Sequence, residues 1–497
     1  MTSETTHPAQ APRGAEIDAA SAKRNRIVIA VLLVSAFVVM LNETVMGVAL
    51  PRLMESLDVT ATAAQWLTTA FLLTMAIVIP ITGFLIQRIN SRPLFISAIS
   101  LFSVGTLICA VAPGIEVLIF GRVVQAAGTA IMMPLLMTTV MTLVPPATRG
   151  RTMGNISIVM TVAPAIGPTI SGVILNYLDW RWLFWLILPI SLGALALGWR
   201  LMQNVTTPRY APLDILSVVL SALGFGGLVY GLSTIGEASH GEPILPIWVP
   251  IVVGAVGIGI FIWRQLILQR RDGALLDFRT FTFPAYTIAL SMMVINMMAL
   301  FGMIILLPIF TQSVMGLDTL QTGLLLFPGG LLMGLLAPFV GRWYDRIGPT
   351  PLVVPGAALV SAVMWAMTQL TQDTPVAFVL AGHLTLSLGL ALLFTPLFTA
   401  SLGALPKRLY SHGSAMLGTL QQVAGAAGIA LFISLMTLRS EAMIAQGAGQ
   451  VEALTGGLQL AFLTGALLSL ISLAAAFFVR RSDSPSDAVA GEAAPAP

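Results

Sequence analysis

Apolar runs of about 20 residues follow one another along most of the chain and are separated by short polar stretches. A helix of this length crosses the hydrocarbon core of a bilayer, so each run predicts a membrane-spanning helix. The pattern predicts an all-α polytopic membrane protein with about fourteen spans, near residues 27–49, 66–86, 93–112, 116–142, 152–176, 182–202, 213–235, 246–265, 282–307, 321–341, 351–370, 375–400, 412–438 and 459–479.

The two ends of the chain lack such runs. Residues 1–26 and 481–497 are rich in small and polar residues and are expected to form disordered tails. The spans between them divide into a first six-helix half, a two-helix insert with its following loop, and a second six-helix half, at residues 27–204, 205–280 and 281–480.

Charge is scarce and unevenly distributed. Only 9% of the residues are charged and 57% are hydrophobic, whereas a soluble domain has about a quarter charged. All but four of the 24 lysines and arginines lie on the side of the two chain ends; the exceptions are Arg52, Arg122, Arg181 and Arg439. The positive-inside rule therefore predicts that both termini are cytoplasmic. Because the basic excess reflects topology, no nucleic-acid partner is expected.

One carboxylic acid lies deep within a predicted span. Glu43 is eight residues before Pro51, and Arg122 is eight residues after Gly114. At a rise of 1.5 Å per residue, both lie ~12 Å from the same membrane boundary. An ionisable group at such a depth costs about 2.5–3.5 kcal/mol, and it usually has a partner and a function.

Two kinds of role fit this acid. Burial favours the protonated form of a carboxyl group, and a nearby guanidinium favours the ionised form. An acid that alternates between these surroundings would bind and release a proton, which is what proton-coupled transport requires. The alternative is structural: a fixed Glu43–Arg122 bridge that orders two helices, or an Arg122 bonded to backbone carbonyls.

A sequence repeat relates the two halves. Residues 80–94 match residues 338–352 at a constant offset of 258, which pairs Gly83 with Gly341 and Arg88 with Arg346. Transporters built from parallel repeats have this organisation. Chance similarity between two short junctions is the alternative.

Several motifs resemble those of a known family. Gly341, Asp345, Arg346 and Gly348 resemble the signature loop of the major facilitator superfamily. Residues 122–130 resemble its fourth-helix motif. Residues 154–172, which include Pro164, Gly167, Pro168 and Gly172, resemble its fifth-helix antiporter motif. Residues 180–189 and the stretch 40–53 resemble the fourteen-spanner drug:proton antiporter family.

This resemblance implies a major facilitator fold with two extra central helices, in which helices one and four adjoin. The chain also departs from the family pattern. Gln87 stands where the first signature loop has an aspartate, and Asn42 replaces the first-helix aspartate, with Glu43 beside it. A charged latch is therefore expected at Asp345 and Arg346, whereas its counterpart at Gln87 is in doubt.

The candidate site residues fall into three groups. Glu43, Arg122 and Asn42 are expected to couple proton movement. The loop motifs are expected to gate the cytoplasmic side, and the glycines and prolines of helix five are expected to form a tight, bent seam, although both residues are common in membrane helices. The polar candidates for the substrate cavity are Gln125, Asn155, Asn296, Gln312, His383, Gln421 and Gln422. Only a few of them are expected to contact substrate, because such a residue more often forms a hydrogen bond between two helices.

Other energy sources and chemistries are not indicated. Neither lysine, Lys23 nor Lys407, follows a glycine, so there is no phosphate-binding loop for ATP. Cys109 is the only cysteine, which excludes a cysteine metal cluster. No cofactor, metal or enzymatic activity is expected.

The resulting prediction is proton-coupled efflux of amphipathic, often cationic drugs across a bacterial cytoplasmic membrane by alternating access. Its partners would be drug-like molecules, protons and lipid. A dedicated exporter of one antibiotic or endogenous metabolite is the first alternative. A membrane sensor or assembly factor that does not transport is the second.

Overall fold

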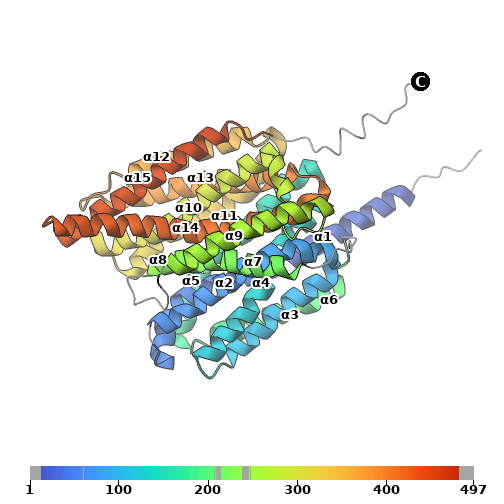
Figure 1. Cartoon of the computed structure of the whole chain (residues 1–497), viewed down its shortest axis with the longest axis horizontal. Helices are drawn as coiled ribbons and strands as arrows, with labels where there is room; N and C mark the ends of the chain where they lie inside the picture. The colour runs from blue at the N-terminus through green and yellow to red at the C-terminus, as the bar shows by residue number, and fades with distance from the viewer. Residues whose placement is uncertain are drawn as a thin grey trace, which may run out of the picture.

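The structure, a computed structural model, describes residues 13–59, 61–205, 214–237 and 248–480, together with Pro208 and Pro246. Within these ranges every regular element is helical (Figure 1). Thirteen helices of the described chain are long and apolar enough to cross a membrane. The helix α5 (Arg149–Tyr177) lies among them in the bundle and completes the expected set of about fourteen spans.

The first half contains six long helices. They are α1 (Arg13–Leu57), α2 (Ala61–Arg88), α3 (Ser91–Ala110), α4 (Ile115–Leu143), α5 and α6 (Trp182–Leu201), with a 3-10 turn at Pro146–Thr148. The start of α1 differs from the sequence prediction. Residues 13–26, expected in the disordered tail, already belong to this helix, while residues 1–12 lie outside the described chain. Residues 481–497, the other expected tail, also lie outside it.

The second half repeats the first. It comprises α10 (Pro284–Ile309) with the π-helical turn Phe310–Val314, followed by α11 (Thr319–Ile347), α12 (Thr350–Met367), α13 (Val376–Gly403), the 3-10 turn Lys407–Leu409, α14 (Tyr410–Ala445) and α15 (Gln450–Ala476). Moving α2 along the chain by the 258-residue offset gives 319–346, which is almost the whole of α11. The two six-helix halves inferred from the repeat are therefore confirmed.

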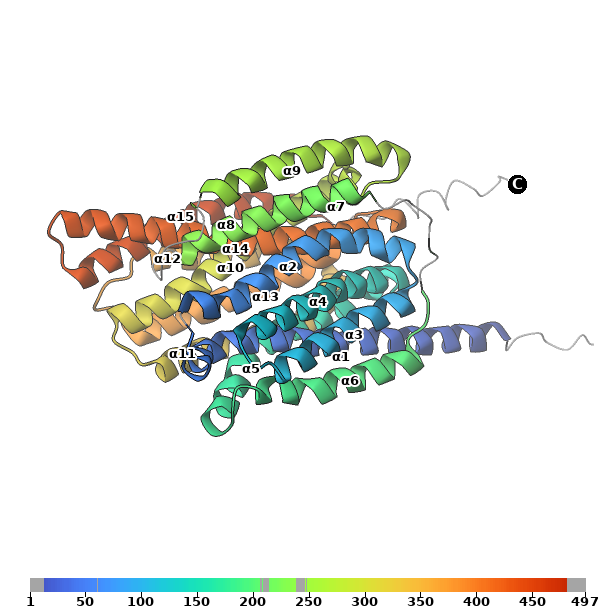
Figure 2. The same ribbon diagram turned by 60° about the horizontal axis from the view of Figure 1, so that its bottom comes forward.

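An insert of two spans joins the halves. Its first span consists of α7 (Ile215–Ser221), the π-helical turn Ala222–Gly226 and α8 (Gly227–Glu237), and its second is α9 (Trp248–Leu268). Glycines allow these spans to pack closely, since a Cβ on Gly227 would lie 3.0 Å from the Cα of Gly254. The first span lies along both α2 and α14, and Trp66 of α2 stacks on Tyr230 of α8 with the ring centres 5.7 Å apart (Figure 2). The insert thus covers a seam between the halves.

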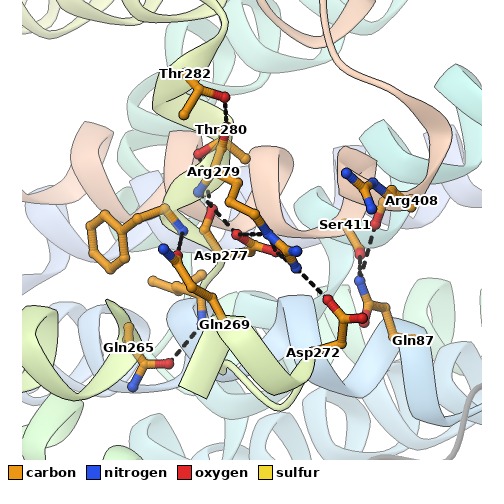
Figure 3. A network of polar contacts seen from close by, with 12 residues as sticks. Gln87, Gln265, Gln269, Asp272, Asp277, Arg279, Thr280, Thr282, Arg408 and Ser411 are labelled. Atoms are coloured by element: carbon orange, nitrogen blue, oxygen red, sulfur yellow. Dashed lines mark hydrogen bonds and ion pairs between the residues drawn. The ribbon is translucent and has the colours of Figure 1, made fainter. Parts of the chain in front are cut away.

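Polar contacts fix the loop that follows α9 (Figure 3). The fully buried Gln265 accepts the backbone N–H of Leu275 at 2.7 Å and donates to Ser217 of α7 at 2.7 Å. Arg279 donates to the carboxylate of Asp277 at 2.6 Å and to that of Asp272 at 2.5 Å. These bonds hold the loop together and against the insert, just before α10 begins.

The bundle has two ends. The end where α1 begins and α15 finishes is called the terminus face here; it lies to the right in Figure 1 and carries the α2–α3, α4–α5, α11–α12 and α13–α14 connections. The other end, called the opposite face, carries the α1–α2, α3–α4 and α5–α6 connections. This division sets the depth of every site residue.

Candidate functional site

Arg122 is the centre of a buried polar network between helices. Its side chain is only 1% exposed. Nη1 donates to Asn42 Oδ1 at 3.0 Å and to Gln125 Oε1 at 2.7 Å, and Nε donates to the Leu67 carbonyl at 3.5 Å. The guanidinium carbon also lies 3.9 Å from the centre of the Phe71 ring, a cation–π contact. Helices α1, α2 and α4 thus meet at one cation.

The network continues into α3. Gln125 donates through Nε2 to Thr106 Oγ1 at 2.8 Å, and Thr106 in turn donates to the Phe102 carbonyl at 2.7 Å. The helices can approach this closely because Gly105 has no side chain; a Cβ there would lie 2.5 Å from the backbone nitrogen of Gln125. Gln125 is therefore held in one orientation, with its oxygen toward Arg122.

Glu43 lies beside this network without forming an ion pair with Arg122. It follows Asn42 on α1 and is half-buried. Among the described residues it forms no ion pair within 4.0 Å, although Arg122 is near enough to act on it electrostatically. A fixed Glu43–Arg122 bridge is thus not the arrangement in this conformation. In this conformation the guanidinium donates to the neutral oxygens of Asn42, Gln125 and Leu67.

The fifth helix packs tightly at two of its glycines. A Cβ on Gly167 would collide with Thr44 of α1, and a Cβ on Gly154 would collide with the Ala337 carbonyl of α11. Pro164 and Pro168 lie between the start and end of α5, which continues unbroken through both. A seam against α1 and α11 is therefore present.

Gly172 departs from the expected seam. A Cβ at this position would meet nothing within 4 Å. Its match to the family motif therefore does not reflect close packing in this conformation, unlike that of Gly167.

Asp345 joins the halves at the terminus face. Its Oδ1 accepts the backbone N–H of Gly150 at 2.7 Å, and its Oδ2 accepts that of Arg151 at 2.8 Å. Within α5 these N–H groups have no hydrogen-bond partner, because they lie in its first turn, where the helix dipole also favours a negative charge. A Cβ on Gly341 would collide with the Gly150 carbonyl, so the glycine permits the approach. A carboxylate of one half thus caps a helix of the other.

Gln87 makes the equivalent contact in the opposite direction, from the first half to the second. The 258-residue offset relates it to Asp345. Its Nε2 donates to Ser411 Oγ at 2.9 Å and to the Arg408 carbonyl at 3.3 Å, at the start of α14 (Figure 3). Gly83, one turn earlier, permits close packing, since its Cβ would lie 3.1 Å from that of Ala415. Hydrogen bonds donated by a neutral side-chain amide therefore take the place of those accepted by a carboxylate.

The other residues of the loop motifs lie at or near the ends of their helices. The Arg88 guanidinium lies 5.7 Å from the centre of the Phe84 ring. Arg346 is exposed. Gly348 ends α11 with φ of +80°, a conformation that side chains other than glycine rarely adopt. Asp345 is thus the motif residue that reaches across to the first half.

Further hydrogen bonds between the halves lie nearer the bundle interior. Thr138 and Ser414 share one at 2.7 Å, and Ser157 and Thr395 share another at 2.9 Å. Arg149 also donates to the Tyr410 hydroxyl, at 3.3 Å. Together with the Gln87 and Asp345 contacts, these inter-half hydrogen bonds of the described chain lie in the half of the bundle nearer the terminus face. That end is therefore closed in this conformation.

The remaining cavity candidates are dispersed. Asn296 is buried and donates to the Met292 carbonyl at 2.7 Å and to Ser472 at 2.9 Å. His383 places Nε2 3.0 Å from the Leu326 carbonyl. Neither residue joins the Arg122 network. The other candidates are half-buried on α14 in the case of Gln421 and Gln422, and exposed in the case of Asn155 and Gln312.

Sequence reasoning missed three members of the network. Phe71 and Leu67 are apolar residues in an apolar span, and Thr106 is a common small polar residue. The spacing of these residues relative to Arg122 carries no signal, because they lie on other helices. The sequence could have indicated these residues only through their distance from the membrane boundary, compared with that of Arg122.

Comparison with known proteins places the chain in a family. Residues 32–429 match the Major Facilitator Superfamily. The chain belongs to that superfamily. It is 40% identical to lincomycin resistance protein LmrB of Listeria monocytogenes over 460 residues, which cover 92% of this chain and 97% of that protein. It is 29% identical to the multidrug resistance protein B homolog of Mycobacterium tuberculosis over 401 residues, which cover 79% and 73% of the two chains.

A solved structure agrees in fold. The crystal structure of the human organic anion transporter MFSD10 superposes with a TM-score of 0.66 at 16% identity, covering 91% of this chain and 99% of that one. The major facilitator fold and the relationship to drug-efflux transporters, both expected from the sequence motifs, are thus confirmed. This protein is a multi-pass membrane transporter of small molecules whose relatives confer antibiotic resistance.

Proposed function

We propose that this transporter exports amphipathic, often cationic drugs across the bacterial cytoplasmic membrane in exchange for protons, with both termini in the cytoplasm. The observation that carries the proposal is the position of Glu43. It is half-buried within a span, electrostatically coupled to Arg122, and free of a fixed ion pair. An acid placed in this way can exchange a proton when its surroundings change.

Arg122 would set the affinity of Glu43 for that proton. Its hydrogen bonds to Asn42, Gln125 and the Leu67 carbonyl keep the cation in place whether or not Glu43 is ionised. A fixed positive charge favours the ionised acid, and burial favours the protonated acid. A shift of α1 relative to α4 would alter this balance and so release or bind the proton.

Alternating access would open and close the two ends of the bundle in turn. The Asp345 and Gln87 contacts would hold the cytoplasmic end closed, and their release would admit substrate from the cell. The tight contacts of α5 with α1 and α11, at Gly167 and Gly154, would limit leakage of protons along the seam. Topology supports this orientation, since most lysines and arginines lie on the terminus face.

One specific observation favours a narrower substrate range. A relative that aligns along almost its whole length carries the name lincomycin resistance protein. A dedicated exporter of one antibiotic class is therefore the second candidate, with the same proton coupling.

The test uses proteoliposomes that contain the purified protein and a pH-sensitive dye. Lincomycin and a lipophilic cation are each added with and without an imposed pH gradient. Drug:proton exchange predicts uphill movement of a compound that collapses the gradient. Movement of lincomycin alone supports the narrower function. A chain that moves neither compound and leaves the gradient unchanged would contradict both.

A further inference from the structure

A recess lies on the opposite face, away from the Arg122 network. Its volume is about 490 Å³, and it is lined by Asp179, Arg181, Trp182 and Trp185, at the turn from α5 into α6. The helix α6 is at the outer edge of the bundle (Figure 2). It buries residues such as Leu183 on its inner side. Trp182 and Trp185 point outward and remain 50% and 40% exposed.

The surface of α6 that continues from the recess is apolar. Leu186, Ile190 and Leu197 are all exposed along it. In a membrane protein such a surface faces hydrocarbon, and exposed indole rings at its end mark the level of the lipid headgroups. The recess therefore opens both to water and to the edge of the bilayer.

Two opposite charges are fixed at this level. Arg181 Nη1 lies 3.4 Å from Asp179 Oδ1, and the two side chains are 36% and 49% exposed. The guanidinium is held in place because Nη2 donates to the Ala112 carbonyl at 2.9 Å and because it stacks on Trp180, 4.2 Å from the ring centre. An isolated cation would meet Arg181, and an isolated anion would meet Asp179. A ligand that carries both charges matches the pair.

We propose that this recess binds the headgroup of a phospholipid that carries a phosphate and a primary ammonium, that is, a phosphatidylethanolamine of the outer leaflet. The phosphate oxygens accept hydrogen bonds from Arg181, and the ammonium donates to Asp179. The acyl chains then pass over Trp182 and Trp185 and follow the apolar side of α6. A choline headgroup has no N–H to donate, and a glycerol headgroup has no cation.

Native mass spectrometry of the purified full chain tests this assignment. The protein is incubated with equal amounts of phosphatidylethanolamine, phosphatidylcholine and phosphatidylglycerol, and retained lipids are counted. Phosphatidylethanolamine is expected to be retained most. Asp179→Asn keeps an oxygen for the backbone N–H of Arg181, which donates to Asp179 Oδ1 at 2.9 Å, but loses the charge. Its retention of phosphatidylethanolamine should fall about two- to fivefold, the range for one exposed ion pair.

A matched control comes from the same face. Arg52 and Glu55 form an exposed ion pair, also at 3.4 Å, which is not part of the recess. Glu55→Gln should leave lipid retention unchanged. Trp185→Leu should lower retention of all three lipids, because it removes the chain contact without touching the charges. Equal retention of the three lipids by the unaltered protein, or unchanged phosphatidylethanolamine in both Asp179→Asn and Trp185→Leu, would overturn the proposal.

Discussion

The carboxylate of Asp345 offers the sharpest test of the closed terminus face. Asp345→Asn preserves the shape of the side chain but removes its charge and one of its two acceptor oxygens. Gly150 and Arg151 donate to those oxygens at 2.7 and 2.8 Å. A hydrogen bond to a charged group contributes about 1.5–3 kcal/mol, and the amide restores at most part of one. A net loss of this size shifts the equilibrium toward the open end roughly 10- to 150-fold.

The open population can be measured from the reactivity of a buried position behind the contact. Ser414 is 3% exposed and lies between the halves. Ser414→Cys is introduced together with Cys109→Ser, so that the chain has one thiol. The rate of labelling by a membrane-impermeant maleimide, added to everted vesicles, then follows the open fraction. Asp345→Asn should raise this rate by the factor above, and transport turnover should fall more than substrate affinity.

Asp318 provides the matched control. Its carboxylate accepts the Gln321 backbone N–H at 2.7 Å at the start of α11, but the bond lies within one half and on the opposite face. Asp318→Asn should leave the labelling rate of Ser414→Cys unchanged. If the labelling rate in Asp345→Asn were within about twofold of the rate with Asp345 intact, the Asp345 contacts would not be what keeps the terminus face closed.

Three further predictions follow from the geometry. Arg122→Lys should abolish transport, because an ammonium lacks both the planar fork that donates to these acceptors and the flat face that stacks on Phe71. Arg149→Lys, at a position that is also buried, should retain proton coupling, measured as pH-gradient collapse. Gly167→Ala should lower the thermal midpoint because its Cβ collides with Thr44, and adding Thr44→Ala should recover part of the loss. The bonds from Arg264 hold the pKa of Asp214 at about 2, below its usual value near 3.9. The ionised form thus stabilises the fold above about pH 4, and this contribution is lost as the pH falls toward 2. Melting curves of Asp214→Asn should therefore depend less on pH in that window, and an unchanged dependence would contradict the ion pair's role.

Much of the fold was predictable because membrane spans obey strong constraints. Backbone groups in lipid must bond within a helix, so long apolar runs indicated the spans directly. The 258-residue repeat predicted that α2 and α11 occupy equivalent places. The start of α1 was not predictable, because the apolar signal begins only near Ile27 although the helix begins at Arg13.

The sequence indicated the membrane depth of the candidate site but not which side chains contact each other there. The sequence placed Glu43 and Arg122 at one level, yet the contact is made by Asn42. One residue along a helix turns the side chain by about 100°, and no periodic pattern specifies which of two neighbours faces α4. Gln87 shows a related limit. The loss of its charge cast doubt on a latch, but an amide can donate where a carboxylate would accept.

Glu43 is proposed here as the carrier of the exchanged proton. The most direct measurement compares Glu43→Gln with the unaltered protein in proteoliposomes, using a transported drug, an imposed pH gradient and a pH-sensitive dye. Glu116→Gln, which alters an exposed acid at the opposite face, serves as the control. Glu43→Gln is expected to fold and to exchange drug when its concentration is equal on the two sides, but neither to accumulate drug uphill nor to move protons. Full uphill accumulation by Glu43→Gln, with the same proton flux as the control, would exclude this role for Glu43.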